Sequence, residues 1–221
     1  MFHVEQDRVL SEVLRQGARD FGLSLTGEAL ASFLLYLHDL LVWNDKLNLT
    51  AIRKEREIVV KHFLDSLACL QVLPKTAEHV LDIGTGAGFP GIPVKILCPE
   101  VELTLLEPSL KKTAFLHHVI GTLGLKKATV VSRRVEVVAA DPEHRARYGT
   151  VLSRALEIMD VLPFLRPLLR PDGRAILWRA RPLDKNMALP GLKLVQELTY
   201  TLPEGHGMRL LAVLEPITNQ A

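Results

Sequence analysis

The sequence predicts an α/β protein in which a doubly wound, mostly parallel sheet of seven strands follows a helical segment. Three observations support this fold class. Apolar residues recur at helical spacing over residues 1–75, and from residue 79 onward short β-rich runs alternate with helical stretches. A glycine-rich turn follows the first of these runs. We therefore expect an N-terminal helical cap at residues 1–75 and a sheet domain at residues 76–221.

The helical segment contains three apolar stripes. They fall at residues 9–14, residues 30–41 and residues 59–67, and Thr26 is a suitable N-cap for the second. Stripes of this kind indicate packing surfaces. Residues 74–78 break the pattern and predict a linker.

The sheet domain contains seven strand candidates. They lie at 79–83, 101–106, 128–132, 148–153, 174–179, 192–200 and 209–214, with helical stretches such as 90–97 and 109–123 between most of them. The last two strands are joined by a short loop that holds Pro203, Gly205 and Gly207. Because that loop is too short for a crossover helix, the last strand should run antiparallel.

The amino-acid composition limits the class of protein and the compartment in which it works. Hydrophobic residues make up 48% of the 221 residues, which is ample for a core. Glu5, Asp7 and Arg8 interrupt the N-terminus, and no apolar run reaches about 18 residues, so we expect neither a signal peptide nor a membrane span. The isolated cysteines Cys69 and Cys98 are typical of a reducing cytoplasm. The histidines form no ligand motif, so no metal site is expected.

The glycine-rich turn predicts a nucleotide-like cofactor. Residues 80–93 read Val-Leu-Asp-Ile-Gly-Thr-Gly-Ala-Gly-Phe-Pro-Gly-Ile-Pro. Glycine lets the backbone approach a ligand closely, and the helix start that follows presents free N–H groups. The expected contacts are Asp82, Gly84, Thr85, Gly86, Gly88 and Phe89.

Two cofactors compete for this turn. Residues 86–91 satisfy GxGxxG, so a nicotinamide-dependent oxidoreductase is one alternative. Asp82 favours S-adenosylmethionine, because a carboxylate can bind an ammonium group but repels a pyrophosphate. Pro90 and Pro93 lack the N–H donors that a pyrophosphate would use. Glu107 ends the second strand and could bind ribose hydroxyls of either cofactor.

The end of the fourth strand indicates the acceptor, since ligands of such sheets lie beyond the carboxyl ends of the strands. The sequence there is Leu152-Ser-Arg-Ala-Leu156, without an Asn/Asp-Pro-Pro-aromatic motif or a Pro-Cys pair. Arg154 is a forked donor that cannot act as a base. It suits an acceptor that carries no proton, such as N7 of a purine, and guanine O6 and N7 match arginine well. A structural ion pair is the alternative role for Arg154.

Six motifs follow one another along the chain. They are Asn48-Leu-Thr-Ala-Ile-Arg53, Lys61-His-Phe-Leu-Asp-Ser-Leu67, Asp82-Ile-Gly-Thr-Gly-Ala-Gly-Phe-Pro-Gly91, Lys111-Lys-x-x-Phe-Leu116, Arg134-Val-Glu136 and Ser153-Arg-Ala155. In this order they resemble the bacterial 16S ribosomal RNA (guanine-N7)-methyltransferases, the glucose-inhibited division protein B family. The resemblance covers nearly the whole chain. Many methyltransferases share the glycine motif, whereas the two motifs upstream of it are much more specific.

The resemblance implies a class I methyltransferase fold and a cytoplasmic enzyme that uses S-adenosylmethionine. The implied reaction is methylation of N7 of one guanosine in a conserved loop of the small-subunit RNA. The expected partner is 16S ribosomal RNA or a precursor of the 30S subunit, with no membrane, and the chain should act as a monomer. A cofactor-binding ribosome-assembly factor without turnover is the alternative.

The resemblance also implies roles for individual residues. On the cofactor side, Gly84 and Phe89 would flank the methionine moiety, Glu107 would bind the ribose, and Val135 and Glu136 would contact the adenine. Arg154 would lie beside both the cofactor and the target base. The acceptor side would be lined by Asn48, His62, Asp65 and Ser66. Three of these residues also have a purely structural alternative. Asn48 could cap a turn, and His62 and Asp65 could hydrogen-bond to neighbouring backbone.

The sequence departs from the family pattern at two positions, and the role of the adjacent lysines Lys111 and Lys112 has two interpretations. Glu107 stands where the family usually has aspartate, and Arg179-Ala180 replaces the usual Lys-Gly at the end of the fifth strand. Arg179 keeps the cation, so it joins Arg154 and Asn48 as a candidate catalytic residue. Lys111 and Lys112 could contact the RNA backbone or form a solvated face.

Overall fold

The sheet has the predicted topology. The computed structural model describes residues 2–154 and 156–217, so Ala155 of the last motif lies outside the described residues. Seven strands form one sheet in the order β3-β2-β1-β4-β5-β7-β6, and β7 alone runs in the direction opposite to the other six. The strands are β1 (His79–Ile83), β2 (Glu102–Leu106), β3 (Ala128–Val131), β4 (Tyr148–Ser153), β5 (Leu169–Arg179), β6 (Leu192–Thr201) and β7 (Met208–Pro216).

The largest difference from the predicted strand boundaries is at the start of β5, and the others are of one or two residues. β5 begins at Leu169 rather than at 174, because Leu169 pairs with Tyr148 before the register shifts between Tyr148 and Thr150. The extra pairing precedes a bulge and leaves the carboxyl end of β5 where the sequence predicts it.

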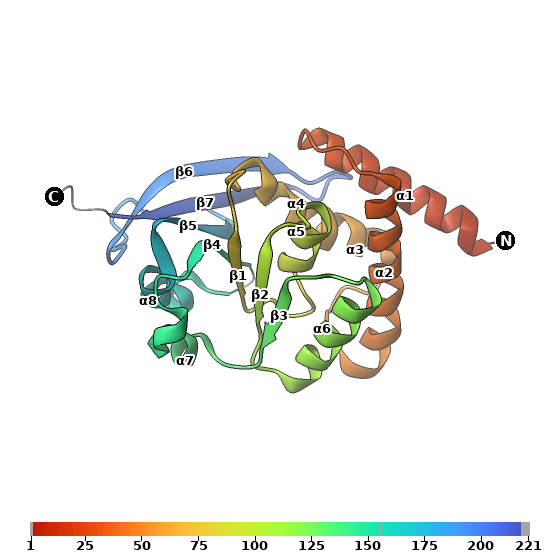
Figure 1. The fold of residues 1–221 in the computed structure, drawn as a ribbon. Coiled ribbons are helices and arrows are strands. Elements are labelled where there is room, and N and C mark those ends of the chain that lie inside the picture. Colours follow the sequence, from red (N-terminus) through yellow and green to blue (C-terminus); the bar gives the residue numbers. More distant parts are fainter. Residues whose placement is uncertain (1, 155, 218–221) are drawn as a thin grey trace.

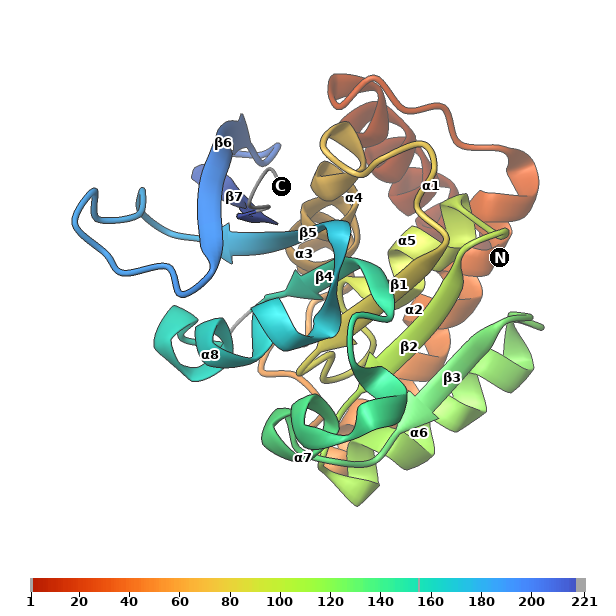
Figure 2. The same cartoon turned by 60° about the vertical axis from the view of Figure 1, so that its left-hand side comes forward.

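Helices cover both faces of the sheet (Figures 1 and 2). They are α1 (Phe2–Asp20), α2 (Gly27–Leu47), α3 (Glu55–Ile58), a π-helix η1 (Val59–Leu64), α4 (Asp65–Leu67), η2 (Ala68–Gln71), α5 (Gly91–Leu97), α6 (Leu110–Thr122), α7 (Val135–Ala140), η3 (Pro142–His144) and α8 (Ile158–Leu168). Thr26 is the N-cap of α2 as expected, with its Oγ1 accepting from Ala29 N at 3.1 Å. No helix in the described part of the chain is long and apolar enough to cross a membrane.

Two apolar cores lie on opposite faces of the sheet. The cap packs with α5 and α6 into one cluster, which includes Phe33, Tyr36 and Phe63 of the cap together with Phe89 and Phe115. The other cluster joins α7 and α8 to the opposite face. Because the cap and the sheet share one core, the expected division between residues 75 and 76 stays a prediction.

The third apolar stripe of the cap forms a π-helix rather than a regular α-helix. This wider turn, Val59–Leu64, contains His62 and continues into Asp65 of α4. Single π-turns are rare and occur often at functional sites. Here the π-turn faces the end of β4, because Arg154 donates to the backbone oxygen of Lys61 at 3.2 Å.

The carboxyl ends of the central strands meet at one edge of the sheet. The glycine turn follows β1, Glu107 follows β2 and Arg154 follows β4. The strand order reverses between β1 and β4, which is the position at which doubly wound sheets bind their ligands.

Candidate active site

A cleft of about 850 Å³ lies at this edge of the sheet. This volume is typical of a site for a small molecule. Ten of the sequence-predicted site residues line it, namely His62, Gly84, Thr85, Gly86, Phe89, Glu107, Lys112, Val135, Glu136 and Arg154. The other seven, Asn48, Asp65, Ser66, Asp82, Gly88, Lys111 and Arg179, are not in its lining.

Asp82 stabilises the glycine turn through hydrogen bonds to two of its residues. Its carboxylate is fully buried, and Oδ2 accepts from Thr85 Oγ1 at 2.6 Å and from Gly91 N at 2.7 Å. Burial raises the pKa of Asp82 to about 6, against the opposing effect of these two hydrogen bonds. The predicted contact of Asp82 with an ammonium group therefore has no support from the lining of the cleft and stays a prediction.

Glu107 links the turn to the end of β2. Its Oε2 accepts from Gly86 N at 3.0 Å, and its Oε1 accepts from Ser109 N at 2.9 Å. Gly86 has a φ of +62°, and Gly84 a φ of +69°. A carboxylate offers about four acceptor positions, so Glu107 can still accept from two hydroxyls.

The cap holds the glycine turn through Tyr36, which the sequence did not single out. The fully buried Tyr36 hydroxyl donates to the backbone oxygen of Ala87. Burial raises the pKa of Tyr36 well above its usual value of 10.0, so the hydroxyl stays protonated. Gly88 faces this contact, since a Cβ there would lie 2.6 Å from the Tyr36 hydroxyl. Gly88 therefore shapes the turn from behind the cleft.

Arg154 lies at the centre of a hydrogen-bond network between β4 and the cap. Its Nη1 donates to Asp65 Oδ2 at 2.9 Å, and its Nη2 donates to His62 Nδ1 at 2.8 Å. The guanidinium carbon lies 5.5 Å from the ring centroid of Phe89. The Arg154 and Asp65 side chains are 12% and 9% exposed, so the pair is nearly dry. Arg154 is therefore both a structural ion pair and part of the cleft wall.

The network fixes the tautomer of His62. Since Arg154 can only donate, Nδ1 of His62 must accept, and the proton lies on Nε2, which is 2.8 Å from Thr50 Oγ1. The ring stacks on Phe89 with centroids 4.6 Å apart. Burial, followed by the charge of Arg154, lowers the pKa of His62 to about 3. His62 is thus neutral with both nitrogens engaged, and it cannot serve as a free base.

His62 should make the stability of the fold sensitive to acid. Its pKa is about 3 when folded and about 6.5 when unfolded, so the unfolded chain binds the extra proton between these values. Stability from His62 is present above pH 6.5 and is lost as pH falls toward 3. Asp82, with a raised pKa of about 6, has the opposite sign between pH 6 and about 3.8. We expect wild type to lose stability on acidification faster than His62→Asn, whose amide oxygen can replace Nδ1. Urea unfolding from pH 7 to 4 measures this difference, and parallel curves would contradict it.

Asn48 and Ser66 make hydrogen bonds outside the lining of the cleft, and Arg179 lies at the end of β5. Asn48 is the C-cap of α2, with a φ of +51°, and its Oδ1 accepts from Arg53 Nη2 at 2.9 Å. The buried Ser66 hydroxyl donates to the backbone oxygen of His62 at 2.5 Å. Arg179 ends β5, and its buried Nε has no partner within the described residues. Catalytic roles for Asn48 and Arg179 stay predictions.

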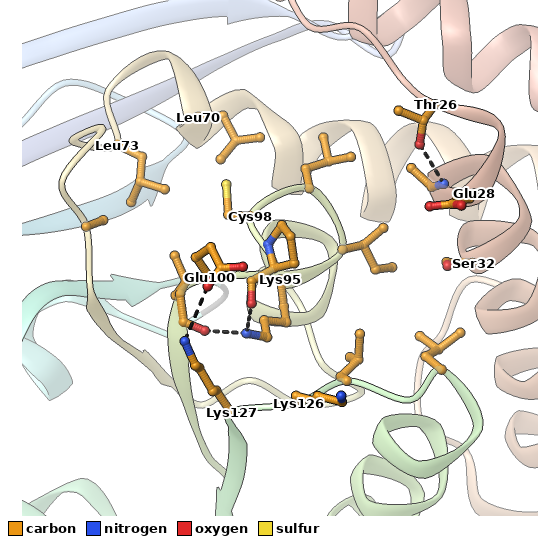
Figure 3. A pocket seen from close by; sticks show the side chains of 18 of the residues that line it. Thr26, Glu28, Ser32, Leu70, Leu73, Lys95, Cys98, Glu100, Lys126 and Lys127 are labelled. Carbon is orange, nitrogen blue, oxygen red and sulfur yellow. Dashed lines mark hydrogen bonds and ion pairs between the residues drawn. The ribbon is translucent and has the colours of Figure 1, made fainter.

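A larger hollow of about 960 Å³ lies at the opposite edge of the sheet, among segments that precede β1, β2 and β3 (Figure 3). Lys95, Lys127, Glu100 and Thr26 of its lining have hydrogen-bond or ion-pair partners. Lys95 Nζ donates to the backbone oxygens of Pro99, at 2.6 Å, and Val101, and Lys127 pairs with Glu100 at 3.3 Å. Thr26 caps α2. None of the sequence-predicted site residues lines this hollow, whereas ten of them line the cleft beside Arg154.

The sheet order and the cleft at its reversal point define a class I methyltransferase fold. Among solved structures, TrmN from Thermus thermophilus matches with a TM-score of 0.55 and 19% identity, over 70% of this chain and 48% of that chain. This likeness concerns the fold alone.

Sequence comparison identifies the family. The GidB family, described as rRNA small subunit methyltransferase G, matches residues 29–195. The ribosomal RNA small subunit methyltransferase G of Roseiflexus castenholzii is 44% identical over 176 residues, which are 79% of this chain and 75% of the relative. That of Acetivibrio thermocellus is 36% identical over 206 residues, 90% of this chain and 85% of the relative. The chain belongs to this family, which confirms the resemblance, the fold class and the class of enzyme, and neither alternative function finds support.

Proposed function

We propose that this chain methylates N7 of a guanosine in 16S ribosomal RNA with S-adenosylmethionine as the methyl donor. The relatives are named as methyltransferases of small-subunit ribosomal RNA. The observation that carries the choice of N7 is the state of Arg154 and His62, which together offer hydrogen-bond donors and no free imidazole base.

The residues of the cleft suit S-adenosylmethionine. Glu107 keeps acceptor positions for a ribose diol, and Val135 and Phe89 provide apolar walls for an adenine ring and a methionine chain. A Cβ on Gly84 would lie 2.6 Å from Leu156 Cδ1, so glycine keeps this part of the turn open. When bound, S-adenosylmethionine supplies a methyl group on a positively charged sulfur.

Arg154 retains donors for the acceptor base. A guanidinium has five N–H groups, and three of them are used by Lys61 O, Asp65 and His62. Within the described residues, the Nε–H and one hydrogen of Nη2 remain. Guanine O6, next to N7, would accept from such a donor, which leaves the lone pair of N7 free to attack the methyl group. Because N7 carries no proton, the side chains need only align the base and exclude water.

Methyl transfer is tested with purified protein, 16S RNA or 30S subunits, and S-adenosylmethionine labelled in its methyl group. We expect the label to appear in N7-methylguanosine at one position, located by reductive cleavage at that base. Label in another nucleoside, or none in RNA of either form, would refute the proposed reaction. The same assay shows whether naked RNA or the assembled subunit is the substrate.

Cations on α6 should contact the RNA backbone. Lys112 lines the cleft and Lys111 precedes it, and neither has an ion-pair partner within the described residues. We expect Lys111→Ala/Lys112→Ala to weaken RNA binding and to reduce the salt slope by about 0.7 for each lost phosphate contact. Fluorescence anisotropy over a range of KCl concentrations measures this slope.

The matched control removes two cations from the cap. Arg53 pairs with Asp45 at 3.4 Å, and Arg56 pairs with Glu204 at 2.6 Å. These charges are already compensated, so Arg53→Ala/Arg56→Ala should change the slope less. Equal slopes for both double variants would remove the assigned role of α6.

We also propose a cytoplasmic location and a monomeric enzyme.

A further inference from the structure

We propose that Tyr200 of β6 is a positioning residue for the acceptor side of the cleft, acting through Asp65 on Arg154. The inference rests on the proposed function, because it concerns the residue that presents donors to the base. Tyr200 is not in the lining of the cleft, and it lies in the C-terminal hairpin, whereas the cleft is built by the central strands and the cap.

Asp65 is held from two sides. Its Oδ1 accepts from the Tyr200 hydroxyl at 2.6 Å, while its Oδ2 accepts from Arg154 Nη1 at 2.9 Å. Trp178 of β5 also donates from Nε1 to the backbone oxygen of Asp65, at 3.0 Å. With one oxygen tied to each partner, the carboxylate cannot rotate without breaking a buried hydrogen bond. Tyr200 thereby determines which oxygen faces Arg154.

The Tyr200 hydroxyl is a permanent donor. Tyr200 is 7% exposed, and burial together with the nearby charge of Asp65 raises its pKa far above the usual value of 10.0. The other titratable or charged groups near this hydroxyl are Arg154 and Cys69, and the latter thiol is also buried and protonated. The hydroxyl therefore keeps donating to Asp65 throughout the working range of pH.

This arrangement selects the free donors of Arg154. Asp65 and the Lys61 carbonyl occupy Nη1, and His62 occupies one hydrogen of Nη2. If Asp65 turned away, Nη1 would be released and the guanidinium could present a different edge to the cleft. A small misplacement of a group that aligns a substrate reduces the rate by between about tenfold and a hundredfold.

Tyr200→Phe removes the hydroxyl and keeps the ring that packs edge-on against Phe21, with centroids 5.7 Å apart. We expect kcat for RNA methylation to fall by about tenfold or more, while the Kd for S-adenosylhomocysteine stays within about twofold. Rates are normalised to active sites titrated with S-adenosylhomocysteine, so a loss of folded protein does not count. The matched control is Tyr148→Phe, because the Tyr148 hydroxyl is also buried, lies 2.6 Å from His144 Nδ1, and has no link to Arg154.

A double-mutant cycle separates positioning from a structural role. If Tyr200 acts through Arg154, Tyr200→Phe should have little further effect on single-turnover rates in an Arg154→Lys background. Normal kcat for Tyr200→Phe, an equal loss for Tyr148→Phe, or a full additional loss in the Arg154→Lys background would each overturn the inference. Absence of methyl transfer by the wild-type enzyme would instead refute the proposed function, so the two failures are distinguishable.

Discussion

Replacing Gly88 by alanine is expected to abolish cofactor binding and to destabilise the fold by about 2–5 kcal/mol. Gly88 has a φ of +102°, a conformation that costs an L-residue about 1–2 kcal/mol. The added Cβ would lie 2.4 Å from Ile92 Cδ1 and 2.6 Å from the Tyr36 hydroxyl, so overpacking adds about 1–3 kcal/mol. Relief of the clash requires Tyr36 to release Ala87, which would move the turn.

The control for Gly88→Ala is Gly124→Ala. Gly124 has a φ of +60°, and nothing would lie within 4 Å of its Cβ, so this variant measures the cost of a positive φ without a steric clash. We expect it to cost only about 1–2 kcal/mol and to bind S-adenosylhomocysteine normally. Urea unfolding and calorimetric titration measure the two effects. If both variants lost the same stability and both bound the ligand, the contact between cap and turn would not matter to the cofactor site.

The sequence predicted those parts of the fold and site that depend on local chain signals. The seven strands follow from β-rich runs, and the short loop near Gly205 predicted the antiparallel strand. Glu107 and Arg154 were placed in the cleft because each directly follows a strand end, and the topology brings those ends together. These inferences need no knowledge of side-chain partners.

What the sequence missed depends on contacts between distant residues. Tyr36 is 51 residues from Ala87, and Tyr200 is 135 residues from Asp65. No local sequence pattern distinguishes either tyrosine from an ordinary core residue. Asp82 shows the complementary problem. The sequence placed it correctly at the end of β1, but the direction of its carboxylate depends on Gly91 N and Thr85 in the turn that follows.

The cleft is thus held by side chains that do not line it. Tyr36 of the cap fixes the turn that would receive the cofactor, and Asp65 with Tyr200 fixes the arginine that would receive the base. The cap and the C-terminal hairpin therefore each stabilise one half of the cleft. Variants at these supporting positions should separate cofactor binding from methyl transfer, with Tyr36 affecting the former and Tyr200 the latter.

Replacement of Arg154 should have the largest combined effect on activity and stability. In Arg154→Ala, the buried carboxylate of Asp65 loses its counter-ion, and breaking such a pair costs about 3–5 kcal/mol. Arg154→Lys keeps the charge and should recover part of that stability, but a single ammonium cannot donate to Asp65, His62 and a base in the same geometry. We expect both variants to lose methyl transfer by about a hundredfold or more.

The appropriate comparison is a surface pair of the same chemistry. Arg147 pairs with Glu102 at 3.1 Å, with side chains 43% and 41% exposed, so Arg147→Ala should cost less than about 1 kcal/mol and leave activity intact. Stability comes from urea unfolding at pH 7, and activity from the labelled-methyl assay. An Arg154→Lys enzyme with wild-type kcat would show that charge alone is required. An Arg154→Ala enzyme as stable as Arg147→Ala would show that the Asp65 carboxylate is not isolated from water, and the network would then have no positioning role.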